Sequence, residues 1–61
     1  GIILGNQGRY LDAISCFDRV ISIEPNDGGA WYNKGVALEL LGRNTEARTC
    51  FDKAKELGYT G

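Results

Sequence analysis

Two cysteines are the side chains of this sequence whose type could most readily support chemistry. Cys16 and Cys50 occur in the pentapeptides SCFDR and TCFDK, which share Cys-Phe-Asp and differ only by similar residues at their ends. A pair of thiols could form a disulfide, bind a metal ion or act as a redox pair. Alternatively, the whole chain is a duplicated structural unit, and the cysteines were copied along with their neighbours. These interpretations imply different functions.

The spacing of the two pentapeptides favours duplication. Cys16 and Cys50 are 34 residues apart, and the same offset relates many other positions of the 61-residue chain. Identical or similar residues match in the pairs Gly1 and Gly35, Ile2 and Val36, Leu4 and Leu38, Gly8 and Gly42, Arg9 and Arg43, Asp12 and Glu46, Ala13 and Ala47, Phe17 and Phe51, Arg19 and Lys53, and Ile23 and Leu57. We therefore divide the chain into an incomplete copy, residues 1–27, and a complete 34-residue copy, residues 28–61.

The complete copy is predicted to form two helices. The first carries residues of one helical face, at three- and four-residue steps, at Trp31, Gly35, Leu38 and Leu41. Gly42-Arg43-Asn44 interrupts it, with Asn44 as the expected N-cap of a second helix over residues 45–57 and Glu46 well placed for the helix dipole. Gly58 suits the C-terminal cap. The inward face of the second helix would carry Ala47, Cys50, Phe51, Ala54 and Leu57.

The incomplete copy is predicted to contain the end of one helix and the whole of the next. Residues 1–7 form the second half of the first helix, and Gly8-Arg9 matches the interruption at Gly42-Arg43. The next helix is expected over residues 10–23, before Pro25, because proline disfavours helix in the residue that precedes it. Its inward face would carry Ala13, Ile14, Phe17, Val20 and Ile21. Asn26-Asp27 offers a cap for the helix that starts near Gly29.

With this period and pattern, the sequence resembles the tetratricopeptide repeat family over its whole length. The residues that carry the resemblance are Trp31, Gly35, Leu38, Ala47, Phe51 and Ala54 in the complete copy, and Gly1, Leu4, Tyr10, Ala13, Phe17 and Pro25 in the incomplete one. The resemblance implies an all-α fold of antiparallel helix-turn-helix repeats, stacked as an α-solenoid superhelix. Three residues depart from the family pattern: Lys34 replaces a leucine, Val20 a small alanine, and Tyr59 the proline before a following repeat.

The resemblance bears on the cysteines as well. Equivalent residues of stacked repeats lie at least one helix-packing distance apart, about 8–10 Å, whereas a disulfide requires Cα atoms closer than about 7 Å. Two thiols without histidine or CxxC spacing also do not supply the four ligands of a structural zinc site. We therefore predict that Cys16 and Cys50 are small packing residues without a bound metal. An intermolecular disulfide or incidental oxidation is the alternative.

Catalytic groups are scarce in this sequence. There is no histidine, no serine or cysteine with a visible base, and no glycine-rich loop between a strand and a helix. Asp18 and Asp52 are expected to be ordinary surface charges, and Arg48 with Asp52 could form a weak i, i+4 ion pair. We predict that the chain is not an enzyme and uses no cofactor.

The resemblance implies instead a concave groove lined by the first helix of each repeat. In the complete copy this helix would contribute Gly29, Tyr32, Asn33, Val36, Glu39 and Leu40. One variety of the family holds a peptide carboxylate with basic and amide side chains, but only Asn33 matches that pattern here. A stripe of Tyr32, Val36 and Leu40 favours an apolar or helical ligand. Packing against a neighbouring helix is an alternative role for the same stripe.

Composition excludes some classes of partner. The net charge is −1 and the seven Lys and Arg residues are scattered, so nucleic acid binding is not expected. No apolar run approaches the roughly 18–20 residues that span a membrane, and no signal peptide is recognisable, so we expect no membrane partner and a cytoplasmic location. The sequence contains no methionine, and we expect it to be a fragment.

Two functions follow from these observations. The leading hypothesis is a non-catalytic scaffold module whose groove binds a protein or peptide partner. The alternative is self-assembly into a homo-oligomer through exposed half-repeat ends, by head-to-tail contact or by exchange of half-helices. A single core in a chain of 61 residues gives a stability on the order of 3–5 kcal/mol, so contact with a neighbour would help the fold.

Overall fold

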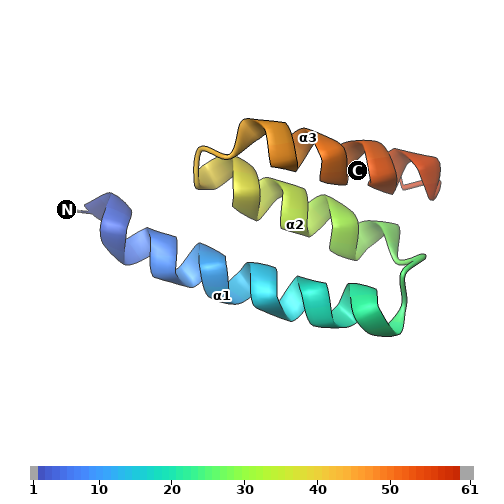
Figure 1. The fold of residues 1–61 in the computed structure, drawn as a ribbon, viewed down its shortest axis with the longest axis horizontal. Coiled ribbons are helices and arrows are strands. Elements are labelled where there is room, and N and C mark those ends of the chain that lie inside the picture. Colours follow the sequence, from blue (N-terminus) through green and yellow to red (C-terminus); the bar gives the residue numbers. More distant parts are fainter. Residues whose placement is uncertain (1, 60–61) are drawn as a thin grey trace.

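Three helices make up the described part of the chain. The computed structural model describes residues 2–59, with side chains from Gly8 onward. Helix α1 spans Ile2–Ile23, α2 spans Gly28–Leu40 and α3 spans Asn44–Glu56. The helices alternate in direction, and α2 lies between α1 and α3 and packs on both (Figure 1). The prediction of an all-α fold is confirmed.

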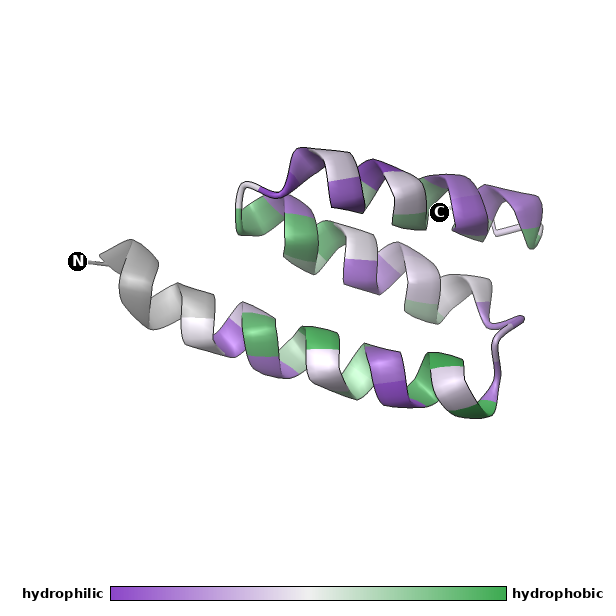
Figure 2. Cartoon of the chain, viewed as in Figure 1, coloured by the Kyte–Doolittle hydropathy of each residue, from purple (hydrophilic) through white to green (hydrophobic). Residues whose placement is uncertain are grey.

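The helices form a flattened layer that is longer and wider than it is thick. The principal dimensions are 37 × 21 × 16 Å, and one helix with its side chains is about 10–12 Å wide. Hydrophobic and hydrophilic stretches alternate along α1, whereas α3 is mostly hydrophilic (Figure 2). The layer therefore has two broad surfaces, and its central helix is the one most enclosed by protein.

Local sequence signals set most helix boundaries. Helix α1 ends two residues before Pro25, as predicted, and the Asp27 carboxylate caps α2 by accepting a 3.2 Å hydrogen bond from the Ala30 amide. Gly42 and Gly58 follow α2 and α3 with φ angles of +85° and +88°. This left-handed conformation lets the glycine's own amide and the amide of the next residue donate hydrogen bonds to carbonyls of the last helical turn and close it. The expected C-terminal cap at Gly58 is confirmed.

The start of α3 differs from the prediction by one residue. Asn44 is the first helical residue, and Arg43 occupies the N-cap without a side-chain hydrogen bond to the helix. Arginine has no side-chain oxygen that could accept from a backbone amide, so the orphan donors of the first turn gain no side-chain partner from it. Glu46 lies in the first turn as expected, and its carboxylate is 3.8 Å from the Arg43 guanidinium. The assignment of Asn44 as N-cap was therefore wrong.

A larger difference concerns Gly8, which lies inside a continuous helix. The expected break at Gly8-Arg9 and a separate helix over residues 10–23 were wrong, because α1 runs from Ile2 to Ile23. Gly8 lacks the positive φ of Gly42, and a Cβ added to it would meet nothing within 4 Å. The backbone of Gly8 is helical like that of its neighbours, so the hydrogen bonds of the helix continue through it.

The core lies between α2 and α3 and is built from small residues. The buried residues are Ala30, Gly35, Ala37, Leu38, Ala47, Cys50 and Ala54. A Cβ on Gly35 would be 2.6 Å from Cε1 of Phe51 and 3.1 Å from the Ala47 carbonyl oxygen, so this contact admits only glycine without a shift of its neighbours. Ile14 of α1, Trp31 and Phe51 pack against the cluster of Leu38, Ala47 and Cys50. The small residues thus bring the helix axes close together.

Equivalent residues of the two sequence copies differ in burial. Ala47 and Ala54 of α3 are each 1% exposed, whereas their counterparts on α1 are a half-buried Ala13 and a Val20 that is 38% exposed. The inward placement of Val20 was therefore wrong. Ala13, Ile14, Phe17 and Ile21 are all half-buried. The reason is topological: α2 covers this face of α3, but no helix of the described chain covers the equivalent face of α1 (Figure 1).

Two parts of the sequence pattern lie outside this description. Gly1 is outside the described residues, and the side chain of Leu4 is outside the described side chains. The division of the chain into repeat units at residues 1–27 and 28–61 stays a prediction.

Candidate functional site

The two cysteines occupy different environments. Cys50 is 4% exposed and packs with Leu38 and Ala47, whereas Cys16 is exposed on α1. Burial raises the pKa of the Cys50 thiol above its ordinary value, and the nearby Lys34 ammonium opposes this effect only in part. A buried thiol kept in its neutral form is a poor nucleophile. The prediction that Cys16 is a packing residue was wrong, since no helix of the described chain covers its side of α1.

Both thiols are free, and they do not assemble a metal site within the described part of the chain. Among the side chains of residues 8–59, no group of three or more His, Cys, Asp or Glu residues is placed to hold a metal ion. In the described part of the chain, Cys16 and Cys50 are therefore not arranged to bind a common metal ion.

An ion pair that the sequence did not predict joins α1 and α2. The Lys34 ammonium lies 2.6 Å from the Asp18 carboxylate, and the two side chains are 23% and 52% exposed. The same ammonium is 5.8 Å from the centre of the Trp31 ring. Asp18 is thus an interhelical partner rather than an ordinary surface charge. Because Asp18 is half exposed, solvent screens the ion pair, which therefore adds little to the stability of the fold. We infer that the pair helps to fix the register of α1 against α2.

The expected ion pair of Arg48 and Asp52 is not among those that the described residues form. Both side chains are exposed on α3. Exposed pairs of this kind gain little, because holding two long side chains together costs rotamer entropy.

The residues predicted to line a groove share one side of α2, which we call the α2 face: Gly29, Tyr32, Asn33, Val36, Glu39 and Leu40. Asn33, Glu39 and Leu40 are exposed, and Leu40 is 56% exposed although it is a large apolar residue. Gly29, Tyr32 and Val36 are half-buried. The structure brings the six residues together along one helix, with the open part of the α2 face near its carboxyl end.

Tyr32 makes aromatic contacts that the sequence did not predict. Its ring centre lies 5.3 Å from that of Phe51 and 5.2 Å from that of Tyr59, in tilted arrangements that are favourable for aromatic pairs. Tyr32 therefore helps to fasten α3 and the segment after it to α2. The contact with Tyr59 was not predicted, although the presence of Tyr59 where the family has proline was visible in the sequence.

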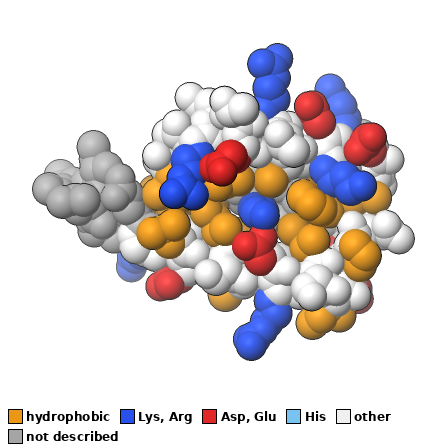
Figure 3. Space-filling view, viewed as in Figure 1, with side chains coloured by type: hydrophobic (Ala, Val, Ile, Leu, Met, Phe, Trp, Pro, Cys, Tyr) orange, Lys and Arg blue, Asp and Glu red, His pale blue; other side chains and the backbone are white. Residues whose placement is uncertain are grey.

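Several hollows adjoin the helices. One, of about 350 Å³, has Trp31, Lys34, Leu38, Arg43 and Cys50 among its lining residues. On the face seen in Figure 3, hydrophobic side chains gather across the middle and charged groups interrupt them.

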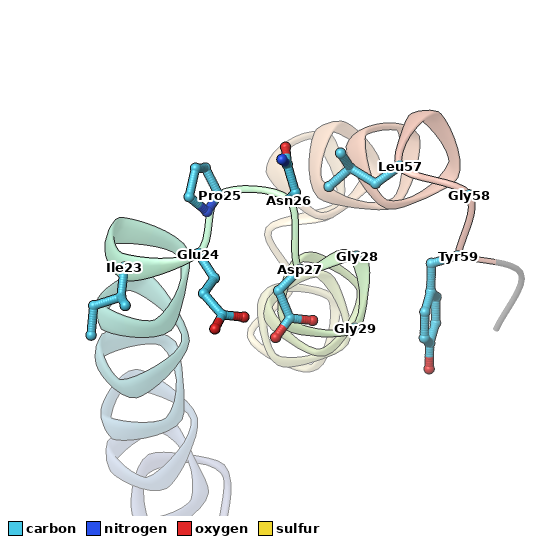
Figure 4. A pocket seen from close by; sticks show the side chains of 10 residues that line it. All are labelled: Ile23, Glu24, Pro25, Asn26, Asp27, Gly28, Gly29, Leu57, Gly58 and Tyr59. Carbon is cyan, nitrogen blue, oxygen red and sulfur yellow. The ribbon is translucent and has the colours of Figure 1, made fainter.

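A larger hollow, of about 840 Å³, lies between the α1–α2 connection and the end of α3 (Figure 4). A 3.0 Å hydrogen bond from the Trp31 indole to the Pro25 carbonyl fixes that connection.

Comparison with known proteins decides the family. The sequence model of the tetratricopeptide repeat matches residues 1–58, which is nearly the whole chain. The chain belongs to the tetratricopeptide repeat family. The resemblance drawn from the 34-residue period is thereby confirmed. Tetratricopeptide repeats are generally non-catalytic, protein-interaction modules.

One relative of this tetratricopeptide repeat chain is an uncharacterized protein of Methanocaldococcus jannaschii. The two are 43% identical over 51 residues, a match that covers 84% of this chain and 59% of the relative. The chain thus spans about three-fifths of that protein. No solved structure shows a significant match to the chain. Within the described residues, no helix of this tetratricopeptide repeat chain is both long and apolar enough to cross a membrane.

Proposed function

We propose that this chain is a non-catalytic interaction module whose α2 face contacts an extended peptide or a helix of a partner protein. The observation that carries the proposal is the exposure of Leu40, Asn33 and Glu39 on a helix that is otherwise enclosed on two sides. A large apolar residue flanked by polar ones is the usual composition of a contact surface with an apolar centre.

The charges of the α2 face narrow the class of ligand. Apart from the Tyr32 phenol, Glu39 is the only ionisable group among the six residues of the α2 face. None of the six is lysine or arginine. A peptide carboxylate would therefore meet no cation on this face. We propose that the ligand is apolar at its centre and neutral or basic at its edge, because a basic group can pair with Glu39.

Leu40→Asp tests this function. Peptides are first selected from a random display library against the folded chain. We expect Leu40→Asp to weaken the selected peptides at least tenfold, because the charge would be desolvated at the apolar centre of the contact. Leu11→Asp is the matched control, since Leu11 is a large apolar residue that is 47% exposed but lies on α1. Affinities are measured by the fluorescence of Trp31. Equal binding by the two variants would rule out the α2 face.

The uncovered face of α1 favours a second function, self-association. We define this face by Ala13, which is half-buried, and Val20, which is 38% exposed, whereas their counterparts Ala47 and Ala54 on α3 are each 1% exposed. A second copy could cover it, because a repeat chain gains stability from contact with each neighbour.

Sedimentation velocity over a hundredfold range of concentration tests self-association. We expect the wild-type sedimentation coefficient to rise with concentration and Val20→Asp to remain monomeric, because the aspartate would be buried without a partner. Leu40→Asp, on the α2 face, should behave like the wild type. A wild-type chain that stays a monomer over the whole range would contradict this function.

A further inference from the structure

The first turn of α2 is covered by the side chain of Tyr59, which follows α3 in the sequence. The Tyr59 ring lies 5.2 Å from the Tyr32 ring, centre to centre. Tyr59 also lies against two consecutive glycines: a Cβ on Gly28 would be 2.7 Å from the Tyr59 Cβ, and one on Gly29 would be 3.6 Å from Tyr59 Cε1. Figure 4 shows the Tyr59 side chain extending alongside this turn from the end of α3. Gly28, Gly29 and the Tyr32 ring thus form a surface that accepts an aromatic ring, which we call the aromatic subsite.

The aromatic subsite overlaps the α2 face. Gly29 and Tyr32 belong to both, so the amino end of the α2 face is already occupied by the chain's own Tyr59. Leu40, at the other end of the α2 face, is open. A ligand lying along the whole of α2 would therefore have to compete with Tyr59 for the first turn.

Tyr59 is held differently by its backbone and by its side chain. The Tyr59 amide donates a 3.0 Å hydrogen bond to the Ala54 carbonyl, and Gly58 before it has the φ of +88° that closes α3. None of the side-chain hydrogen bonds within residues 8–59 uses the Tyr59 hydroxyl. The ring is therefore held by aromatic and apolar contact alone. Rotation about χ1 can remove it while the backbone stays in place.

We propose that the aromatic subsite binds an aromatic side chain of a peptide partner, and that Tyr59 fills it as an intramolecular competitor. The position of this subsite within a longer groove rests on the proposed function. The adjoining hollow is lined by Glu24 and Asp27 and by no lysine or arginine. An aromatic residue next to a basic residue is thus the favoured ligand, since the basic group would face these carboxylates.

N-acetyl-L-tyrosinamide is a probe that tests the subsite without a known partner. It is titrated into isotope-labelled wild-type chain and into Tyr59→Ala while backbone amide shifts are recorded by NMR. We expect Tyr59→Ala to bind the probe roughly threefold to tenfold more tightly than the wild type, the range that one aromatic contact supplies. The shifts should be confined to Gly28, Gly29, Tyr32 and their neighbours. Equal affinity in the two proteins, or shifts elsewhere, would overturn the proposal.

Controls separate ring recognition from loss of structure. N-acetyl-L-leucinamide should bind neither protein, and Tyr10→Ala, which removes a tyrosine from α1, should behave like the wild type. Tyr59→Phe should also match the wild type, because the hydroxyl is not used. If Tyr59→Ala does not fold, Tyr59→Leu keeps an apolar side chain after α3 but removes the ring that contacts Tyr32, and it carries the same expectation. Binding of the leucine probe as tightly as the tyrosine probe would also overturn the proposal.

The result of the probe titration is independent of the effect of Leu40→Asp on peptide binding. The probe is a single residue that cannot reach from the first turn of α2 to Leu40, and its readout is restricted to the first turn. Failure of the probe to bind Tyr59→Ala would remove the aromatic subsite and leave the effect of Leu40→Asp on peptide binding intact. Failure of Leu40→Asp to affect peptides would leave the probe result intact.

Discussion

Replacing Gly35 with valine is expected to destabilise the chain by about 2–3 kcal/mol, the upper part of the usual range for an overpacked core. The first added carbon would be 2.6 Å from Cε1 and 2.8 Å from Cδ1 of Phe51. Moving the Phe51 ring does not suffice, because the same carbon would be 3.1 Å from the backbone oxygen of Ala47. The helices themselves would have to separate. A chain of this size has a stability on the order of 3–5 kcal/mol, so most of it would be lost.

Urea denaturation followed by circular dichroism measures this loss. Gly8→Val is the matched control, since it places the same side chain in a helix where the added Cβ meets nothing within 4 Å. We expect Gly8→Val to unfold at nearly the wild-type urea concentration, because surface changes of this kind stay within about 0.5 kcal/mol. If the two valine variants unfold together, α2 and α3 do not pack as closely at Gly35 as described.

Gly8→Ala and Gly42→Ala should change stability in opposite directions although the two glycines are equivalent in the repeat. Gly42 has a φ of +85°, a conformation that costs a residue with a Cβ about 1–2 kcal/mol, so Gly42→Ala should destabilise by that amount. Gly8 lies within α1, where alanine is favoured over glycine by about 1 kcal/mol. The two variants should therefore differ by roughly 2–3 kcal/mol.

The same pair of variants decides whether α1 is continuous. The measurement is the urea midpoint of each variant at equal denaturant slope. Stabilisation by Gly8→Ala would agree with a helix that runs through Gly8. Destabilisation similar to that of Gly42→Ala would show instead that Gly8-Arg9 forms a turn, as its counterpart does.

Much of the fold could be predicted because it depends on local signals and on the period. The 34-residue offset indicated the repeat, Pro25 and Asp27 bounded the connection of α1 to α2, and Gly58 closed α3. Each of these residues acts through its own backbone or through a hydrogen bond to a residue nearby in the sequence. Such effects do not depend on what packs against the helix.

The errors concern residues whose conformation or burial depends on whether a helix of the described chain packs against them. Gly8 and Gly42 are each followed by arginine, yet Gly8 continues a helix and Gly42 ends one with a positive φ. Cys16 and Cys50 are also equivalent in the sequence, yet Cys50 is buried against Leu38 of α2 and Cys16 is exposed. The repeat pattern shows which face of a helix should be covered but not whether a covering helix is present.

The alignment of the candidate groove residues along one helix could be predicted from their spacing, but the contacts of their side chains could not. The resemblance placed Tyr32 and Leu40 on one side of a helix, which is a matter of spacing. It did not indicate that the Tyr59 ring would lie against Tyr32, or that Lys34 would pair with Asp18. These are contacts between residues 16 or more positions apart, and they depend on the tilt of one helix against another. A single sequence does not determine that tilt.

The central position of α2 has a consequence for the speed of folding. Each helix packs on the helix next to it in the sequence, through connections of only a few residues. Contacts of this kind close short loops, so little chain entropy is lost before packing compensates for it. Helical chains with such a low contact order fold within microseconds to milliseconds. Because α2 takes part in both interfaces, neither outer helix can gain its contacts until α2 has formed, and α2 is therefore the natural nucleus of the folding transition state.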